Sequence, residues 1–128
     1  MADERDLRFN LLKDHYENHG KSANYLLAAH GVGLLACVTA LKDYAQTPQL
    51  KGIGVLIVIF SVGLLGSILT YASVAVGRMI ALNMAVYENR NYGLTPYYLL
   101  GLNVVGLALA LLCLVAAIAF IIIRFACL

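Results

Sequence analysis

Hydrophobic and polar positions fall into long blocks along this chain. Three apolar segments, residues 22–41, 52–77 and 96–123, are separated by short polar segments. Each is long enough for a helix to cross the hydrocarbon core of a bilayer, which takes about 20 residues. No segment has the two-residue alternation typical of a strand. The pattern predicts an all-α integral membrane protein, a single membrane domain over 1–128 with three transmembrane helices.

A polar segment, residues 1–21, precedes the first apolar block. It mixes acidic and basic residues, and its apolar positions recur at helical spacing, at Leu7, Leu11, Leu12 and Tyr16. This spacing predicts an amphipathic helix that stays outside the lipid. Gly20 weakens that helix near the membrane but does not have to end it.

The middle apolar block continues into a polar region without losing its helical pattern. Helical spacing extends past Arg78 to about residue 88, so the helix would be roughly 50 Å long, against about 30 Å for the hydrocarbon core. We expect the C-terminal part of this helix to project from the membrane. The apolar residues of the projection need cover, which the leucines of the N-terminal helix are predicted to supply within one chain or between copies: Met79, Ile80, Met84 and Val86.

Composition and charge agree with lipid as the solvent. The chain is 62% hydrophobic and 12% charged, and a soluble chain of this size could not bury so much apolar surface. Scattered basic residues and a net charge of +2 do not favour a nucleic-acid partner.

The basic residues also predict an orientation, because cytoplasmic flanks carry the excess of lysine and arginine. Six lie on the N-terminal side of the spans and three on the other: Arg5, Arg8, Lys13, Lys21, Arg78 and Arg90 against Lys42, Lys51 and Arg124. We expect a bacterial inner-membrane protein with a cytoplasmic N-terminus and an external C-terminus.

Small residues form a stripe on one face of every predicted span. Such faces let helix backbones approach closely in lipid. They hold either one three-helix unit or several copies together, and three spans can scarcely enclose a core of their own, which favours a homo-oligomer. The stripes are Ala29, Gly33 and Ala36 in the first span, Gly66, Thr70, Ser73 and Gly77 in the second, and Asn103, Gly106 and Ala110 in the third.

Polar side chains in the middle span are candidates for a pore lining or polar face: Ser67, Thr70, Tyr71, Ser73 and Arg78. Polar residues within a span usually face protein or a water-filled cavity. Arg78 lies near the cytoplasmic boundary. It has three interpretations: a snorkelling anchor, a cation at a pore mouth, or a contact to anionic headgroups.

His30 is the one histidine inside a predicted span, and we expect it to make an interhelical hydrogen bond. Haem would need a second axial ligand, for which the spans offer only Met79, so no cofactor is predicted. His15 and His19 share a helix face but lack the further ligands of a metal site. No metal is predicted.

The sequence contains no recognisable catalytic constellation. No nucleophile–base pair, phosphate loop or carboxylate dyad is present, and no acidic residue lies within a span. We therefore expect neither an enzyme nor a proton-coupled transporter. Two functions stay open: a self-assembling membrane protein, extending to an oligomeric pore or membrane-perturbing effector, and a non-catalytic accessory subunit of a larger respiratory or transport complex.

Overall fold

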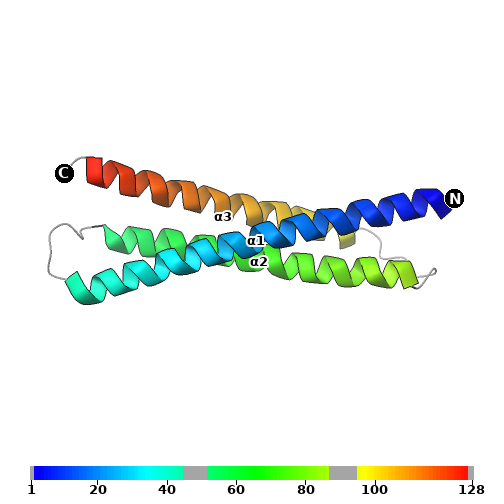
Figure 1. Ribbon diagram of the computed structural model, residues 1–128, viewed down its shortest axis with the longest axis horizontal. Helices are drawn as coiled ribbons and strands as arrows, with labels where there is room; N and C mark the ends of the chain where they lie inside the picture. The colour runs from blue at the N-terminus through cyan, green and yellow to red at the C-terminus, as the bar shows by residue number, and fades with distance from the viewer. Residues whose placement is uncertain (1, 45–51, 87–94, 127–128) are drawn as a thin grey trace.

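The computed structural model describes residues 2–44, 52–86 and 95–126. These residues form three α-helices and no strand: α1 (Ala2–Tyr44), α2 (Ile53–Val86) and α3 (Thr95–Ala126). Successive helices run in opposite directions along the long axis of the molecule, so α1 begins at one end and α3 finishes at the other (Figure 1). The predicted fold class, an all-helical chain with three potential membrane spans, is confirmed.

Each helix contains a section long and apolar enough to cross a membrane, namely Phe9–Lys42, Ile53–Asn83 and Tyr98–Arg124. Lys42 and Arg124 lie in the last turns of α1 and α3, and both helices finish at the same end of the molecule (Figure 1). We expect these cations to lie near one face of the lipid. All three helices exceed the length of about 20 residues that the core requires, so we expect the excess length to extend beyond the opposite face.

α1 is one continuous helix of 43 residues. The change from polar to apolar sequence near residue 21 is therefore a change of character within α1 and not a break. Gly20 is buried because α1 passes close to α2 there, and a Cβ on Gly20 would lie 3.3 Å from Cγ1 of Val74. At about 1.5 Å per residue, α1 is roughly 64 Å long.

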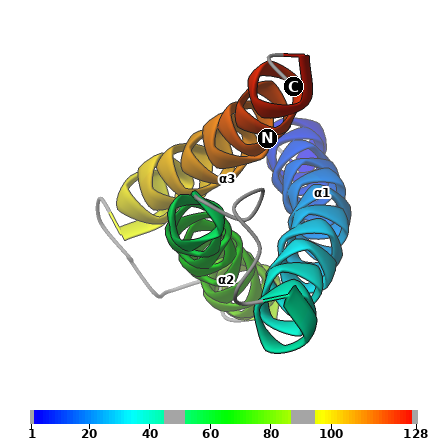
Figure 2. The ribbon, with the colours of Figure 1, turned by 90° about the vertical axis from the view of Figure 1, so that its left-hand side faces the viewer.

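α2 is the central helix, because it packs along both α1 and α3. Direct contacts between α1 and α3 include two hydrogen bonds, one between His19 and Asn103 and one between His30 and Ala110. Toward the end where they finish, α1 and α3 lie apart on different sides of the start of α2 (Figure 2). Near that end the core is a small apolar cluster around Cys37, Phe60 and Ala117.

The start of α2 depends on Gly52. This residue has a φ of +105°, in the left-handed region that favours glycine. Its carbonyl oxygen accepts hydrogen bonds from the backbone N–H groups of Val55 and Leu56, at 3.0 and 3.4 Å. A Cβ here would also come within 2.9 Å of the Phe120 ring. Gly52 therefore begins α2 and lets α3 pass close by.

The projecting parts of α1 and α2 are only partly covered. The Tyr16 ring is buried against Gly77, whereas Leu7 and Leu11 are 60% and 62% exposed. On α2, Met79 is 66% exposed. Within one chain Tyr16 is buried and Leu12 is half-buried, whereas Leu7 and Leu11 do not supply the predicted cover there. Cover between copies stays a prediction. The side chains of residues 84 and 86 lie outside the described residues.

Candidate functional site

The polar residues of α2 point into the three-helix unit. Ser67, Thr70 and Ser73 are buried. Each hydroxyl donates to a carbonyl oxygen of its own helix, at 2.9, 2.9 and 2.8 Å respectively. A hydroxyl in an apolar environment is satisfied in this way without a partner helix. In the described structure these three candidates for a pore lining therefore face other helices of the same chain.

α2 and α3 make their closest contact at two glycines. A Cβ on Gly66 would lie 2.9 Å from the carbonyl oxygen of Gly106, and one on Gly106 would lie 2.6 Å from Oγ1 of Thr70. Ala110 is fully buried at the same crossing. Backbone thus meets backbone, which is the contact that small-residue faces permit.

His30 joins α1 to α3 across this crossing. Its Nε2 lies 2.9 Å from the carbonyl oxygen of Ala110, so Nε2 carries the proton and donates it. The ring covers Gly63, where any Cβ would overlap it, and stands edge-on to Phe60 with ring centroids 5.9 Å apart. Met79 lies 16 residues beyond Gly63 on α2, roughly 24 Å along the helix. His30 and Met79 are therefore too far apart to bind one haem.

A second polar cluster lies where α1 leaves the apolar part of the molecule. The His15 and His19 rings are 4.0 Å apart between centroids, and Nδ1 of His19 is hydrogen-bonded to Oδ1 of Asn103, which is fully buried. Within the described ranges, no group of three or more His, Cys, Asp or Glu residues is placed to hold a metal ion. The cluster links α1 to α3 beyond the glycine crossing.

The small-residue stripe of α1 is only partly covered. Gly33 packs under Phe60, whose Cε1 would lie 2.5 Å from a Cβ. Ala29 is half-buried and Ala36 is exposed. A packing role for Ala36 therefore stays a prediction for a surface outside this chain. A separate face of α2 is apolar and exposed, as a lipid-facing surface would be: Val58, Val62, Leu65, Leu69 and Val76.

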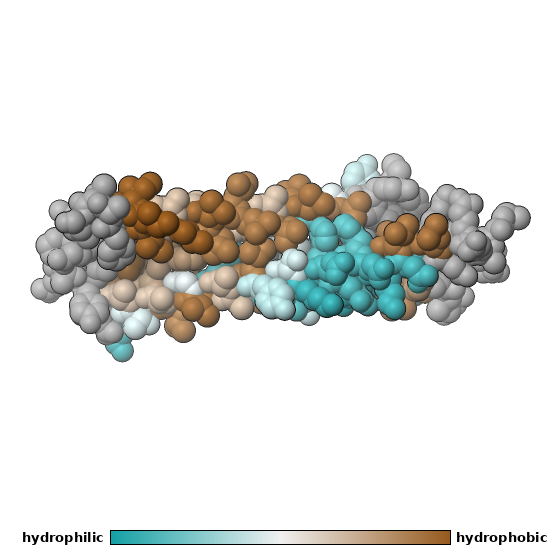
Figure 3. Space-filling view, turned by 45° about the horizontal axis from the view of Figure 1, so that its top comes forward, coloured by the Kyte–Doolittle hydropathy of each residue, from teal (hydrophilic) through white to brown (hydrophobic). Residues whose placement is uncertain are grey.

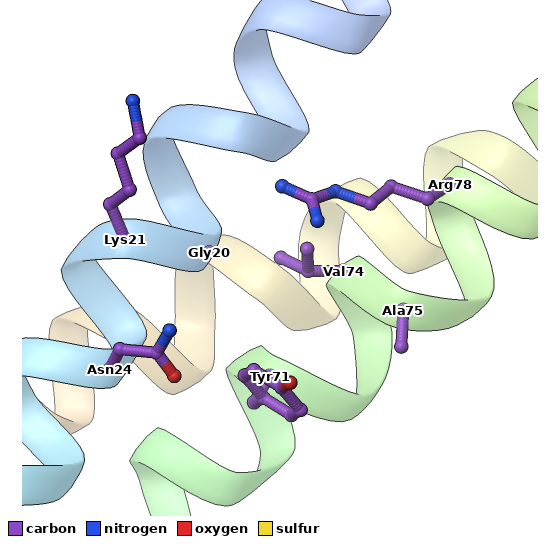
Figure 4. Close-up of a pocket in the computed structure, with 7 residues that line it drawn as sticks. All are labelled: Gly20, Lys21, Asn24, Tyr71, Val74, Ala75 and Arg78. Carbon is purple, nitrogen blue, oxygen red and sulfur yellow. The ribbon is translucent and has the colours of Figure 1, made fainter.

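Tyr71 and Arg78 lie on a different, exposed side of α2. They line a groove of about 280 Å³ between α1 and α2. Figure 4 shows the Arg78 side chain reaching from α2 toward Gly20. Sequence reasoning missed two further polar residues of this groove, Lys21 and Asn24. Lys21 and Asn24 could have been predicted by pairing the two helices antiparallel, with Gly20 and Gly77 at their contact.

Comparison with protein-family models, curated proteins and solved structures gave no match. The fold defines the class: three apolar helices, long enough to cross a bilayer, make a small integral membrane protein.

Proposed function

We propose that this protein assembles with copies of itself in the membrane. The observation that carries the proposal is a set of exposed apolar side chains at the end of the molecule where α1 and α2 exceed the roughly 20 residues needed to cross the lipid core. Leu7 and Leu11 on α1, and Met79 and Leu82 on α2, are 58–66% exposed. Exposed apolar patches of this kind are typical of protein–protein contact sites.

The position of these side chains argues against lipid as their cover. Leu11 precedes residue 22, where the predicted span begins, by 11 residues, so it lies roughly 16 Å beyond the span along α1. The intervening segment is polar, and Figure 3 shows this polar patch with apolar side chains again beyond it toward the N-terminal end. A protein surface is the better cover for side chains placed there.

A second copy of the same chain fits this surface. Both apolar patches project from the same end of the molecule, so the α1 patch of one copy can meet the α2 patch of another in a self-complementary contact. Residues 1–21 contain five acidic and four basic residues. Charge repulsion between copies is therefore small.

The proposal covers assembly and assigns no catalytic step. It also assigns no conducting pathway to Ser67, Thr70 and Ser73, because these side chains are buried within one chain. An accessory subunit of a larger complex is the alternative, in which a different protein covers the same apolar surface. We place the protein in a bacterial inner membrane with its N-terminus in the cytoplasm, on the distribution of lysine and arginine.

Site-specific photo-cross-linking in intact membranes tests the proposal. A photoreactive residue in place of Leu11 is expected to join two copies and give a product of twice the chain mass. The matched control replaces Lys13, which is also exposed but points about 200° away around the helix. It is expected to give little of that product. Cross-links from position 11 only to a larger protein would favour the accessory subunit, and none from position 11 would contradict the proposal.

A further inference from the structure

The groove between α1 and α2 is lined by two cationic and two neutral polar residues. Its lining consists of Gly20, Lys21, Asn24, Tyr71, Val74, Ala75 and Arg78. In Figure 4, Asn24 and Arg78 extend into the space between the helices, from α1 and α2 respectively. The cavity of about 280 Å³ is on the order of twenty times what a single water needs.

The length of α2 places this groove at the expected depth of the lipid headgroups. Counting from Ile53, the start of α2, a core of about 30 Å ends near residue 73. Tyr71, Val74 and Arg78 bracket that point. Each helix has an exposed tyrosine near the level of the groove, Tyr25, Tyr71 and Tyr98, and tyrosine is enriched at membrane–water interfaces.

The donors of the groove are available to an anion. The Nη2 atom of Arg78 makes one long contact, 3.5 Å to the carbonyl oxygen of Tyr16, and a guanidinium has five N–H donors. Among the residues whose side chains the structure describes, no carboxylate lines the groove. Glu17 lies one turn from Lys21 on α1 and is not part of the lining. Gly20 keeps α1 close enough for Arg78 to reach across, since a Cβ there would lie 3.4 Å from Nη2.

We propose that this groove binds the phosphate of an anionic phospholipid headgroup. Arg78 makes the principal contact, because a guanidinium matches a phosphate with paired hydrogen bonds. Lys21, whose ammonium points away from Arg78 in Figure 4, adds positive charge at longer range, and Asn24 and Tyr71 add hydrogen bonds. Deeper in the membrane the lipid tails lie along α1 and α2, where Gly31 has open space beside it and Ile68 is exposed. Free phosphate shares this chemistry, but the depth of the groove favours a lipid.

Native mass spectrometry of the full chain, released from nanodiscs of mixed phosphatidylglycerol and phosphatidylcholine, tests the site. The wild type is expected to retain phosphatidylglycerol in preference to phosphatidylcholine. Arg78→Gln is expected to lower that retention about fivefold or more, the effect typical of one cation at the membrane surface. Arg124→Gln, which removes an exposed arginine at the other end of the molecule, is expected to leave retention unchanged.

A second pair of variants separates the groove from charge alone. Ala75→Phe fills the groove without changing any charge and is expected to lower retention, whereas Ala72→Phe, at an exposed position outside the lining, is not. Equal retention of the two lipids, or equal retention in the Arg78 and Arg124 variants, would overturn the proposal. Inorganic phosphate binding to the wild type in phosphatidylcholine nanodiscs, without selective retention of phosphatidylglycerol, would overturn a lipid as the source.

Discussion

Individual glycines determine how closely these helices pack. The ring of His30 packs against Gly63, the ring of Tyr16 packs against Gly77, and Gly66 contacts the backbone of Gly106. Lipid provides no hydrophobic drive for helices to associate, so such contacts and a few interhelical hydrogen bonds hold the unit together. The bond from His30 to Ala110 lies beside the glycine contacts and fixes α1 against α3.

Gly106→Ala is expected to destabilise the protein by about 1–3 kcal/mol, the usual cost of overpacking. The added methyl would lie 2.8 Å from the carbonyl oxygen of Gly66, which is backbone and can move only if α2 and α3 separate. Gly101→Ala is the control, because nothing lies within 4 Å of that position. It should be neutral, or stabilising by up to about 1 kcal/mol from helix propensity. Reversible unfolding in mixed micelles measures both, and equal stability of the two variants would contradict the packing described here.

At the scale of elements, sequence predicted the helices better than their faces. Three spans and an overlong middle helix could be predicted, because bilayer thickness limits how many residues of an apolar helix lipid can cover. The continuity of α1 could not be predicted, since Gly20 is compatible with a continuous or a broken helix and the sequence does not show its contact with Val74. The burial of Ser67 and Thr70 within one chain could not be predicted either. A helix pattern shows which residues share a face but not which neighbour that face meets.

The ends of the helices carry a prediction about orientation. A fluorescent protein that matures only in the cytoplasm should fluoresce when fused ahead of α1. An alkaline phosphatase, active only outside, should be active when fused after α3. The reason is the excess of lysine and arginine on the N-terminal side. The reverse pattern, with a dark N-terminal fusion, would contradict the cytoplasmic placement.

At the scale of the whole molecule, the three-helix unit is closely packed in its centre and leaves apolar side chains exposed at one end. The glycine crossing, His30 and the α2 hydroxyls are buried within one chain. Leu7, Leu11, Met79 and Leu82 are exposed at the end that is predicted to project from the lipid. The centre of the unit is therefore packed within one chain, and the exposed end is the surface that the proposed self-assembly would cover.

Self-assembly is tested most directly by the protein mass of the particle that is extracted from membranes with its surrounding lipid. One chain has a mass of 13.8 kDa. We expect a protein mass of two or more whole copies of this value, with no other protein present. The double variant Leu7→Asp, Leu11→Asp should return the particle to one chain while the helical content is kept. A wild-type particle containing a single chain, or one chain with a larger partner in fixed ratio, would contradict self-assembly.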